Sequence, residues 1–229
     1  WVESNTPQVP MDHYGQYERP TDDDYEYPNG AYGVMSWWDY GHWITVMAER
    51  IPNANPFQEG PRPASAYLQA SNETRANLIL DALPSDRTAY RDSNEALRDT
   101  LADQSPQRAS EDTRYVVIDD QMAGGKFSAI ATWTGPGSGA YFQQSRYQIQ
   151  GRNVTLAGTN ERYDRTMLSR LYFQDASGLS RYRLVHEVDS YSLVGGYIQG
   201  QRVNPLTSLR LNGDWDSVRG PARQIDSVK

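Results

Sequence analysis

Residues 36–42 read SWWDYGH and place two adjacent tryptophans beside a carboxylate at the start of a predicted helix. Ser36 is a residue type common at helix N-caps, and Asp39 stands three positions later, where a capping-box partner belongs. The pattern predicts a helix from Trp37 to about Arg50. It ends there because the proline two residues later disfavours helical backbone in the residue before it.

The chemistry of this segment matches a hydroxyl group. A hydroxyl has one donor and two acceptor lone pairs, and two indole N–H groups with one carboxylate supply the complement. Trp37, Trp38 and Asp39, held a few ångströms apart, would therefore saturate a serine or threonine side chain. The alternative is that both tryptophans are core anchors and that Asp39 only caps its helix. Residue types alone leave both interpretations open.

A second set of residues follows a predicted buried strand over residues 114–119 (RYVVID). A helix is predicted over residues 120–132. One face of this helix would carry a carboxylate, a thioether, an ammonium and a branched alkyl group, from Asp119, Met122, Lys126 and Ile130. The Gly124-Gly125 pair weakens the helix by about 2 kcal/mol relative to alanine, which predicts a kink. The alternative is an ordinary half-buried helix whose lysine reaches solvent.

The rest of the pattern predicts an α+β fold, with a mainly helical central core and a few strands, followed by a smaller β-rich segment. We expect an extended arm over residues 1–33, the central core over residues 34–180 and the β-rich segment over residues 181–229. Further helices are predicted over residues 64–82, 86–103 and 162–173, and strands over residues 141–149, 153–157 and 182–188, with Gly151 at a bend between strands.

Composition excludes several classes of function. The 229 residues carry a net charge of −7, which argues against nucleic-acid binding through phosphate neutralisation. There is no cysteine and no run near the ~18 apolar residues of a membrane span. The three histidines lack metal-ligand spacing, so we expect no metal site. Because the chain opens at Trp1 without a methionine or a signal pattern, we expect a piece of a longer protein.

Two compositional details concern the protein's environment and modification. Lys126 and Lys229 are the only lysines beside many arginines, a pattern typical of a salt-rich, halophilic environment or of high genomic GC content. Two triplets, Asn72-Glu73-Thr74 and Asn153-Val154-Thr155, have the Asn-x-Thr pattern of glycosylation acceptors. Such triplets also arise often by chance.

The two residue sets together resemble a known family. The pentapeptide WWDYG at residues 37–41 resembles the signature of oligosaccharyltransferase catalytic subunits, and the run VMSWWDYGHWITVMAERIPNANPFQ at residues 34–58 resembles their archaeal, AglB-type branch. The pattern D-x-x-M-x-x-x-K-x-x-x-I at residues 119–130 is similar to the family's second motif, a kinked helix that lines the same pocket. The runs at residues 114–119 and 177–188 also resemble the family's domain, so that most of residues 1–200 are covered.

The resemblance implies a reaction and a set of site residues. These enzymes transfer an oligosaccharide from a dolichyl phosphate carrier to the asparagine of Asn-x-Ser/Thr in an acceptor protein. By resemblance, the indoles of Trp37 and Trp38 would donate to the +2 hydroxyl and Asp39 would accept from it. Met122 and Ile130 would contact the threonine methyl, which is worth up to about 1 kcal/mol. Lys126 and Asp119 would set the shape and charge of the pocket. Tyr40 and Gly41 would shape the turn.

The resemblance also implies what lies elsewhere. The family's metal-binding carboxylates and carrier-lipid site belong to its membrane half, so we expect no catalytic residue in this chain, and Mn²⁺ or Mg²⁺ in the complete enzyme only. The isolated chain would recognise acceptor without transferring sugar. It would work at the extracellular face of an archaeal membrane, tethered through the parent chain. The alternative is a non-catalytic surface domain that binds carbohydrate through exposed aromatic side chains.

Overall fold

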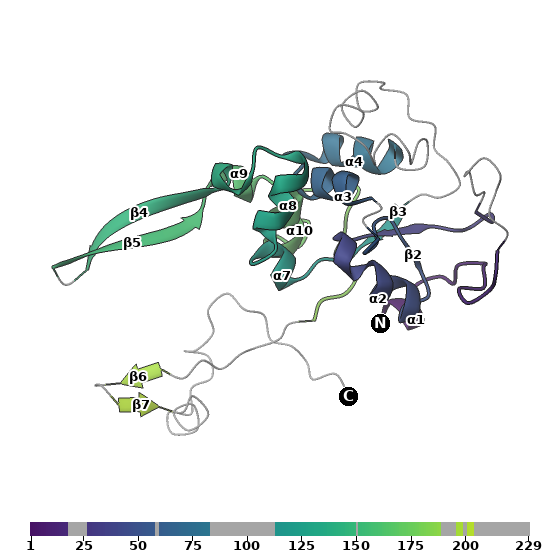
Figure 1. Cartoon of the computed structure of the whole chain (residues 1–229), viewed down its shortest axis with the longest axis horizontal. Coiled ribbons are helices and arrows are strands. Elements are labelled where there is room, and N and C mark those ends of the chain that lie inside the picture. The colour runs from purple at the N-terminus through teal and green to yellow at the C-terminus, as the bar shows by residue number, and fades with distance from the viewer. Residues whose placement is uncertain are drawn as a thin grey trace. The chain divides into compact units, whose positions relative to one another are not determined.

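A computed structural model describes residues 1–17, 27–57, 60–82, 113–149, 151–188, 196–198 and 201–203. The chain divides into two compact units, residues 1–183 and 184–229. The described part combines short helices with three small sheets, which confirms the predicted α+β class (Figure 1). The helix predicted over residues 86–103 lies outside the described residues. The predicted domain limits at residues 33 and 180 stay predictions.

A three-stranded parallel sheet organises the first unit. Strand β1 (Gly33–Met35) lies between β2 (Ile51–Pro52) and β3 (Thr113–Val116). The predicted strand over residues 114–119 is therefore present but ends early, and it is only partly buried. The reason is its position, because β3 is an edge strand with a neighbour on one side only.

The single helix predicted over residues 37–50 is wrong. The chain forms a 3₁₀ turn, η1 (Trp38–Tyr40), and then a short helix, α2 (Gly41–Val46). Ser36 is not the N-cap, since its hydroxyl donates to the Met122 sulfur at 3.8 Å. The helix stops early because the chain turns at Glu49, whose φ of 51° a helix cannot contain.

Two further predicted helices are each divided in two. The helix over residues 64–82 becomes α3 (Pro61–Leu68) and α4 (Glu73–Ala82), because the Asn72 side chain caps a new start by accepting from the Arg75 N–H at 2.9 Å. The helix over residues 120–132 becomes α7 (Asp120–Ala123) and α8 (Phe127–Thr134). The break falls at the glycine pair, where the sequence predicts a kink.

The second half of this unit contains a hairpin and two helices. Strands β4 (Phe142–Ile149) and β5 (Arg152–Thr159) pair antiparallel around Gly151, with φ of +75°, which confirms the predicted strands and bend. The predicted helix over residues 162–173 becomes α9 (Glu161–Asp164) and α10 (Met167–Phe173) because Thr166 caps the second helix. The short elements are η2 (Ser138–Ala140) before the hairpin and α1 (Val2–Asn5) at the start of the chain.

The strand predicted over residues 182–188 is wrong. These residues are irregular, and the side chains of Leu184, Val185 and Val188 are exposed. Alternating apolar residues form a strand only beside a partner, and no described strand pairs with this segment. The second unit contains the hairpin of β6 (Gly196–Ile198) and β7 (Gln201–Val203).

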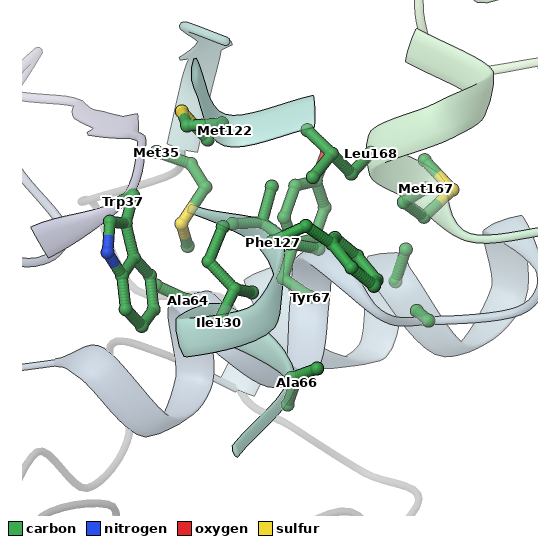
Figure 2. Close-up of a cluster of buried hydrophobic side chains, with 14 of the residues drawn as sticks. Met35, Trp37, Ala64, Ala66, Tyr67, Met122, Phe127, Ile130, Met167 and Leu168 are labelled. Carbon is green, nitrogen blue, oxygen red and sulfur yellow. The ribbon is translucent and has the colours of Figure 1, made fainter. Parts of the chain in front are cut away.

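The main hydrophobic core lies between the sheet and the helices. Side chains from β1, α3, α4, α7, α8 and α10 fill it, including Met35, Tyr67, Phe127, Ile130 and Leu168 (Figure 2). A second cluster surrounds Tyr32 and Val34 on the N-terminal side. None of the helices in the described residues has the length and apolarity needed to cross a membrane.

Candidate functional site

Parallel pairing brings the two residue sets together. Because β1 and β3 are parallel neighbours, the segments that follow them leave the sheet at the same edge. The N–H of Val117 donates to the Met35 carbonyl at 2.9 Å, which holds the two exits side by side. The 3₁₀ turn at residues 38–40 therefore faces the start of α7 and the break before α8.

A chain of polar contacts connects the two exits. Lys126 Nζ lies 2.6 Å from Asp39 Oδ2 and donates to the Tyr40 hydroxyl at 3.0 Å. Tyr40 donates in turn to Asp119 Oδ2 at 2.5 Å. The other oxygen of Asp119 caps α7 by accepting from the Met122 N–H at 2.8 Å. Lys126 thus donates to both Asp39 and Tyr40, and Tyr40 both accepts from Lys126 and donates to Asp119.

The charge states of this chain follow from its contacts. Burial and the hydrogen bond to Asp119 together raise the pKa of Tyr40 to about 12, against the opposing effect of the Lys126 ammonium. Burial by itself would lower the pKa of Lys126, but its hydrogen bonds to Asp39 and Tyr40 and the negative charge of Asp39 outweigh burial and raise it. Near neutral pH, Tyr40 is therefore a neutral donor and Lys126 a cation.

Two polar atoms at this site are buried without a hydrogen-bond partner. They are Trp38 Nε1 and Asp39 Oδ1, a donor and an acceptor on consecutive residues. A buried polar atom without a partner costs about 1–3 kcal/mol. The fold therefore holds one N–H and one carboxylate oxygen available for a group that can both accept and donate a hydrogen bond.

Trp37 has different surroundings from Trp38. Its side chain is 2% exposed and lies in the core cluster with Met35 and Ile130 (Figure 2). Its ring contacts the Trp38 ring at 6.1 Å and the Trp133 ring at 6.4 Å between centroids. Trp37 therefore belongs to the core, and the more exposed indole of Trp38 packs against it.

The structure adds two residues that sequence reasoning missed. Trp133 of α8 stacks edge-on against Trp37, and the Arg62 guanidinium of α3 lies 5.7 Å from the Trp133 ring centroid. The spacing of Trp133 three residues after Ile130 could have indicated it, since residues three apart share a helical face. Nothing local pointed to Arg62, because only the packing of α3 on α8 brings it close.

The predicted common helical face is wrong. Asp119 precedes α7 and Lys126 stands between α7 and α8, so a single helix does not carry all four residues. They converge on the turn at residues 38–40 by separate routes. Asp119 and Lys126 contact its polar side, whereas Met122 and Ile130 are fully buried beneath it.

Gly41 sets the approach of the turn to a neighbouring loop. A Cβ atom at this position would lie 2.5 Å from the Ala54 carbonyl oxygen and 2.6 Å from the Asn55 Cα. Both are backbone atoms of a loop that would have to move. Only glycine therefore allows α2 to begin directly after Tyr40 against this loop.

The described residues do not fit a metal ion. They contain no group of three or more histidine, aspartate or glutamate side chains placed to hold one. The two carboxylates of the site are already bound to Lys126 and Tyr40 through one oxygen each.

Comparison with known proteins gives a consistent result. The family model described as the AglB core domain matches residues 1–92. The chain is 40% identical over 190 residues to the dolichyl-monophosphooligosaccharide–protein glycotransferase AglB of Haloferax volcanii, an alignment that covers 75% of this chain. It covers 16% of that relative, so the chain spans about a sixth of its length.

Two solved structures share the fold. One is an Archaeoglobus fulgidus oligosaccharyltransferase in complex with zinc and sulfate, with a TM-score of 0.63, 31% identity, and coverage of 82% of this chain and 24% of the other. The other is an A. fulgidus oligosaccharyltransferase tethered to an acceptor peptide with an NVT sequon. Its TM-score is 0.59 at 28% identity, with coverage of 79% and 22%.

Proposed function

Because the chain belongs to the AglB family of archaeal oligosaccharyltransferases, we propose that it reads the acceptor sequon for a longer membrane enzyme. That enzyme transfers an oligosaccharide from a dolichyl phosphate carrier to the asparagine of Asn-x-Ser/Thr. Residues 36–40 and 119–130 form the hydroxyl-reading pocket. The carrier lipid and a catalytic Mn²⁺ or Mg²⁺ are held by parts of the enzyme outside this chain, at the extracellular face of the membrane.

The unpartnered atoms of Trp38 and Asp39 carry this proposal. The +2 hydroxyl accepts from Trp38 Nε1 and donates to Asp39 Oδ1, which satisfies both buried atoms at once. An acceptor with alanine at +2 leaves both atoms unpaired, as they are in the free chain. Discrimination therefore comes from the hydrogen bonds that only a +2 hydroxyl supplies to these two atoms.

The neighbouring residues position this pair. Lys126 occupies Asp39 Oδ2 and so directs Oδ1 toward the ligand. Tyr40 and Asp119 hold the ammonium of Lys126 in place from the other side. These three residues act through Asp39 and need not contact the peptide.

The buried residues support the pocket from behind. Trp37 packs between the Trp38 ring and the core, with Ile130 in the same cluster and Met122 close to Ser36. Ile130 and Met122 are fully buried, so we assign them to the support of Trp37. Donation by the Trp37 indole and direct contact of Ile130 and Met122 with a threonine methyl stay predictions.

The test is a double-mutant cycle, in which variants of the full-length enzyme are assayed with variants of the acceptor peptide. Trp38→Phe removes the free donor, and we expect kcat/KM for an Asn-x-Thr peptide to fall about 10–100-fold. The same variant should change turnover of an Asn-x-Ala peptide by less than about twofold, because that peptide makes no hydroxyl contact to lose.

Trp37→Phe is the matched variant. Its ring lies in the core, so we expect a lower Tm together with any loss of turnover, whereas Trp38→Phe should keep its Tm. If Trp38→Phe slowed the two peptides equally, the assignment of Trp38 to the hydroxyl would fail.

An exposed tryptophan favours a second function. Trp43 on α2 is 65% exposed, and aromatic side chains at the surface can stack on sugar rings. Under this alternative the chain is a non-catalytic carbohydrate-binding domain. Glycan binding by the chain alone, abolished by Trp43→Ala but not by Trp38→Phe, would support it.

A further inference from the structure

The chain contains a sequon on its own hairpin. Asn153, Val154 and Thr155 lie in β5, directly after the turn at Gly151. Asn153 pairs with Gln148, and the side chains of Asn153 and Thr155 are exposed. Residues two apart in a strand share a face, so the amide and the hydroxyl of this sequon are presented on one side of the ribbon.

This hairpin can release the sequon at low cost. It is a two-stranded sheet, and among the described strands neither β4 nor β5 has a second partner. An isolated two-stranded ribbon is at best marginally stable in water, and its end opens more easily than a core element. Figure 1 shows β4 and β5 paired as a two-stranded ribbon. If residues 146–149 separate from residues 152–155, the whole triplet is freed and the base of the ribbon stays paired.

The other sequon is built into a helix start. Asn72 Oδ1 accepts from the Arg75 N–H at 2.9 Å and caps α4. Glu73 between the two sequon residues accepts from the Ser180 N–H at 2.8 Å and from the Arg181 N–H at 2.6 Å. Release of this triplet would unwind the first turn of α4 and break both contacts, so it is the natural internal control.

We infer that Asn153 is an N-glycosylation site that the enzyme containing this chain modifies on its own copies. The inference rests on the proposed function. Its sequon has the same three residues, Asn-Val-Thr, as the acceptor peptide tethered to the A. fulgidus relative. Once the ribbon end opens, the Thr155 hydroxyl reaches the Trp38 and Asp39 atoms that are held unpaired for such a group.

The transfer is a single substitution at a sugar carbon. The amide nitrogen of Asn153 forms a bond to the anomeric carbon of an oligosaccharide linked to dolichyl phosphate. The bond from that carbon to the phosphate oxygen breaks, and the lipid phosphate leaves with the bonding electron pair. The amide loses one proton to solvent.

The experiment uses the full-length enzyme in an archaeal cell whose own oligosaccharyltransferase gene is deleted. A secreted reporter protein with an Asn-Val-Thr sequon is produced beside it. Mass spectrometry of glycopeptides measures the occupied fraction at Asn153, at Asn72 and on the reporter. We expect occupancy at Asn153 to exceed that at Asn72 at least about tenfold, because only the ribbon opens readily.

Two substitutions at Thr155 separate recognition from folding. Thr155→Ala removes the hydroxyl and should lower occupancy at Asn153 at least about tenfold. Thr155→Ser keeps the hydroxyl and loses one methyl, so it should lower occupancy by no more than about fourfold. Thr155 is exposed, and both variants should keep the Tm of the parent enzyme.

The outcomes distinguish the inference from the function on which it rests. A modified reporter beside unmodified Asn153, or equal occupancy at Asn153 and Asn72, overturns the inference and leaves the proposed function standing. An unmodified reporter overturns both. Asn153→Gln should leave reporter glycosylation unchanged, since Asn153 lies outside the acceptor pocket.

Discussion

The two carboxylate oxygens of Asp39 have different surroundings, and the difference defines the site. One lies 2.6 Å from the Lys126 ammonium, and the other is buried with no partner. A carboxylate without the lysine could rotate and satisfy either oxygen with water. Lys126 therefore acts on the acceptor through the orientation of Asp39, as a positioning residue.

This role predicts a separation between binding and stability. Lys126→Met removes the contact to Asp39, and we expect acceptor KM to rise about tenfold as Asp39 rotates. The ion pair is about one third exposed on both sides, so its loss should change the free energy of unfolding by less than about 1 kcal/mol. Acceptor titration and urea unfolding measure the two effects. A fall in stability with unchanged KM would contradict the assignment.

The turn between β1 and α2 depends on close backbone packing. The 3₁₀ segment presents Trp38 and Asp39, and α2 begins one residue after Tyr40 because Gly41 fits against the loop at Ala54. In a continuous helix from Trp37, successive side chains would be separated by about 100° around the helix axis, which would change the indole that faces the site.

Gly41→Ala tests this packing. We expect a loss of about 1–3 kcal/mol in the free energy of unfolding, because the new Cβ meets backbone at 2.5 Å. Gly139→Ala is the control, since a Cβ there meets nothing within 4 Å and its change should stay within about 0.5 kcal/mol. Chemical denaturation of both variants gives the comparison. Equal stability of the two variants would show that the loop yields freely.

A buried arginine connects the N-terminal helix to the end of the α2 segment. Arg50 is 1% exposed, and its guanidinium donates to the carbonyls of Glu3 and Thr6 at 3.0 and 2.9 Å and to those of Ala48 and Glu49 at 3.0 and 2.9 Å. Its Nε donates to the Tyr32 hydroxyl at 2.8 Å. The planar fork thus satisfies backbone groups on two separate segments at once.

Lysine has too few donors to replace that fork. Arg50→Lys should lower the free energy of unfolding by about 2–4 kcal/mol, because several buried carbonyls lose their donor. Arg165→Lys is the matched control, since Arg165 pairs with Glu161 at the exposed surface and should lose less than about 0.5 kcal/mol. Urea unfolding of both variants decides, and a small loss for Arg50→Lys would mean that water reaches these carbonyls.

At the scale of the whole chain, charge predicts a dependence on salt. The chain has a net charge of −7 and only two lysines, so its acidic side chains repel one another. Salt screens that repulsion within a few ångströms. We expect Tm to rise by a few degrees from dilute to molar potassium chloride. Sucrose at matched osmotic strength is the control, because it favours compact states without screening charge. Equal Tm in dilute and molar salt would remove the prediction of a halophilic environment.

Much of the local structure could be predicted because it depends on neighbouring residues only. Gly151 supplies the positive φ of the hairpin turn, and the glycine pair at 124 and 125 weakens the helix at the place where it breaks. The strand predicted over residues 182–188 failed for the opposite reason, because a strand needs a partner that its own residues do not supply. Ser36 looked like a cap but lies against Met122, which is 86 positions away.

The candidate site, like the fold, could be predicted from the sequence only in part. Its chemistry was present in the residue types, since two indoles and one carboxylate are the groups that complement a hydroxyl. Which indole lacks a partner depended on the tertiary structure, because Trp37 is buried in the core cluster whereas Trp38 is only partly buried against it. The pairing of β1 with β3 then brings Lys126 to Asp39 across 87 positions. Residue types carry donors and acceptors, but only packing decides which of them are left without a partner.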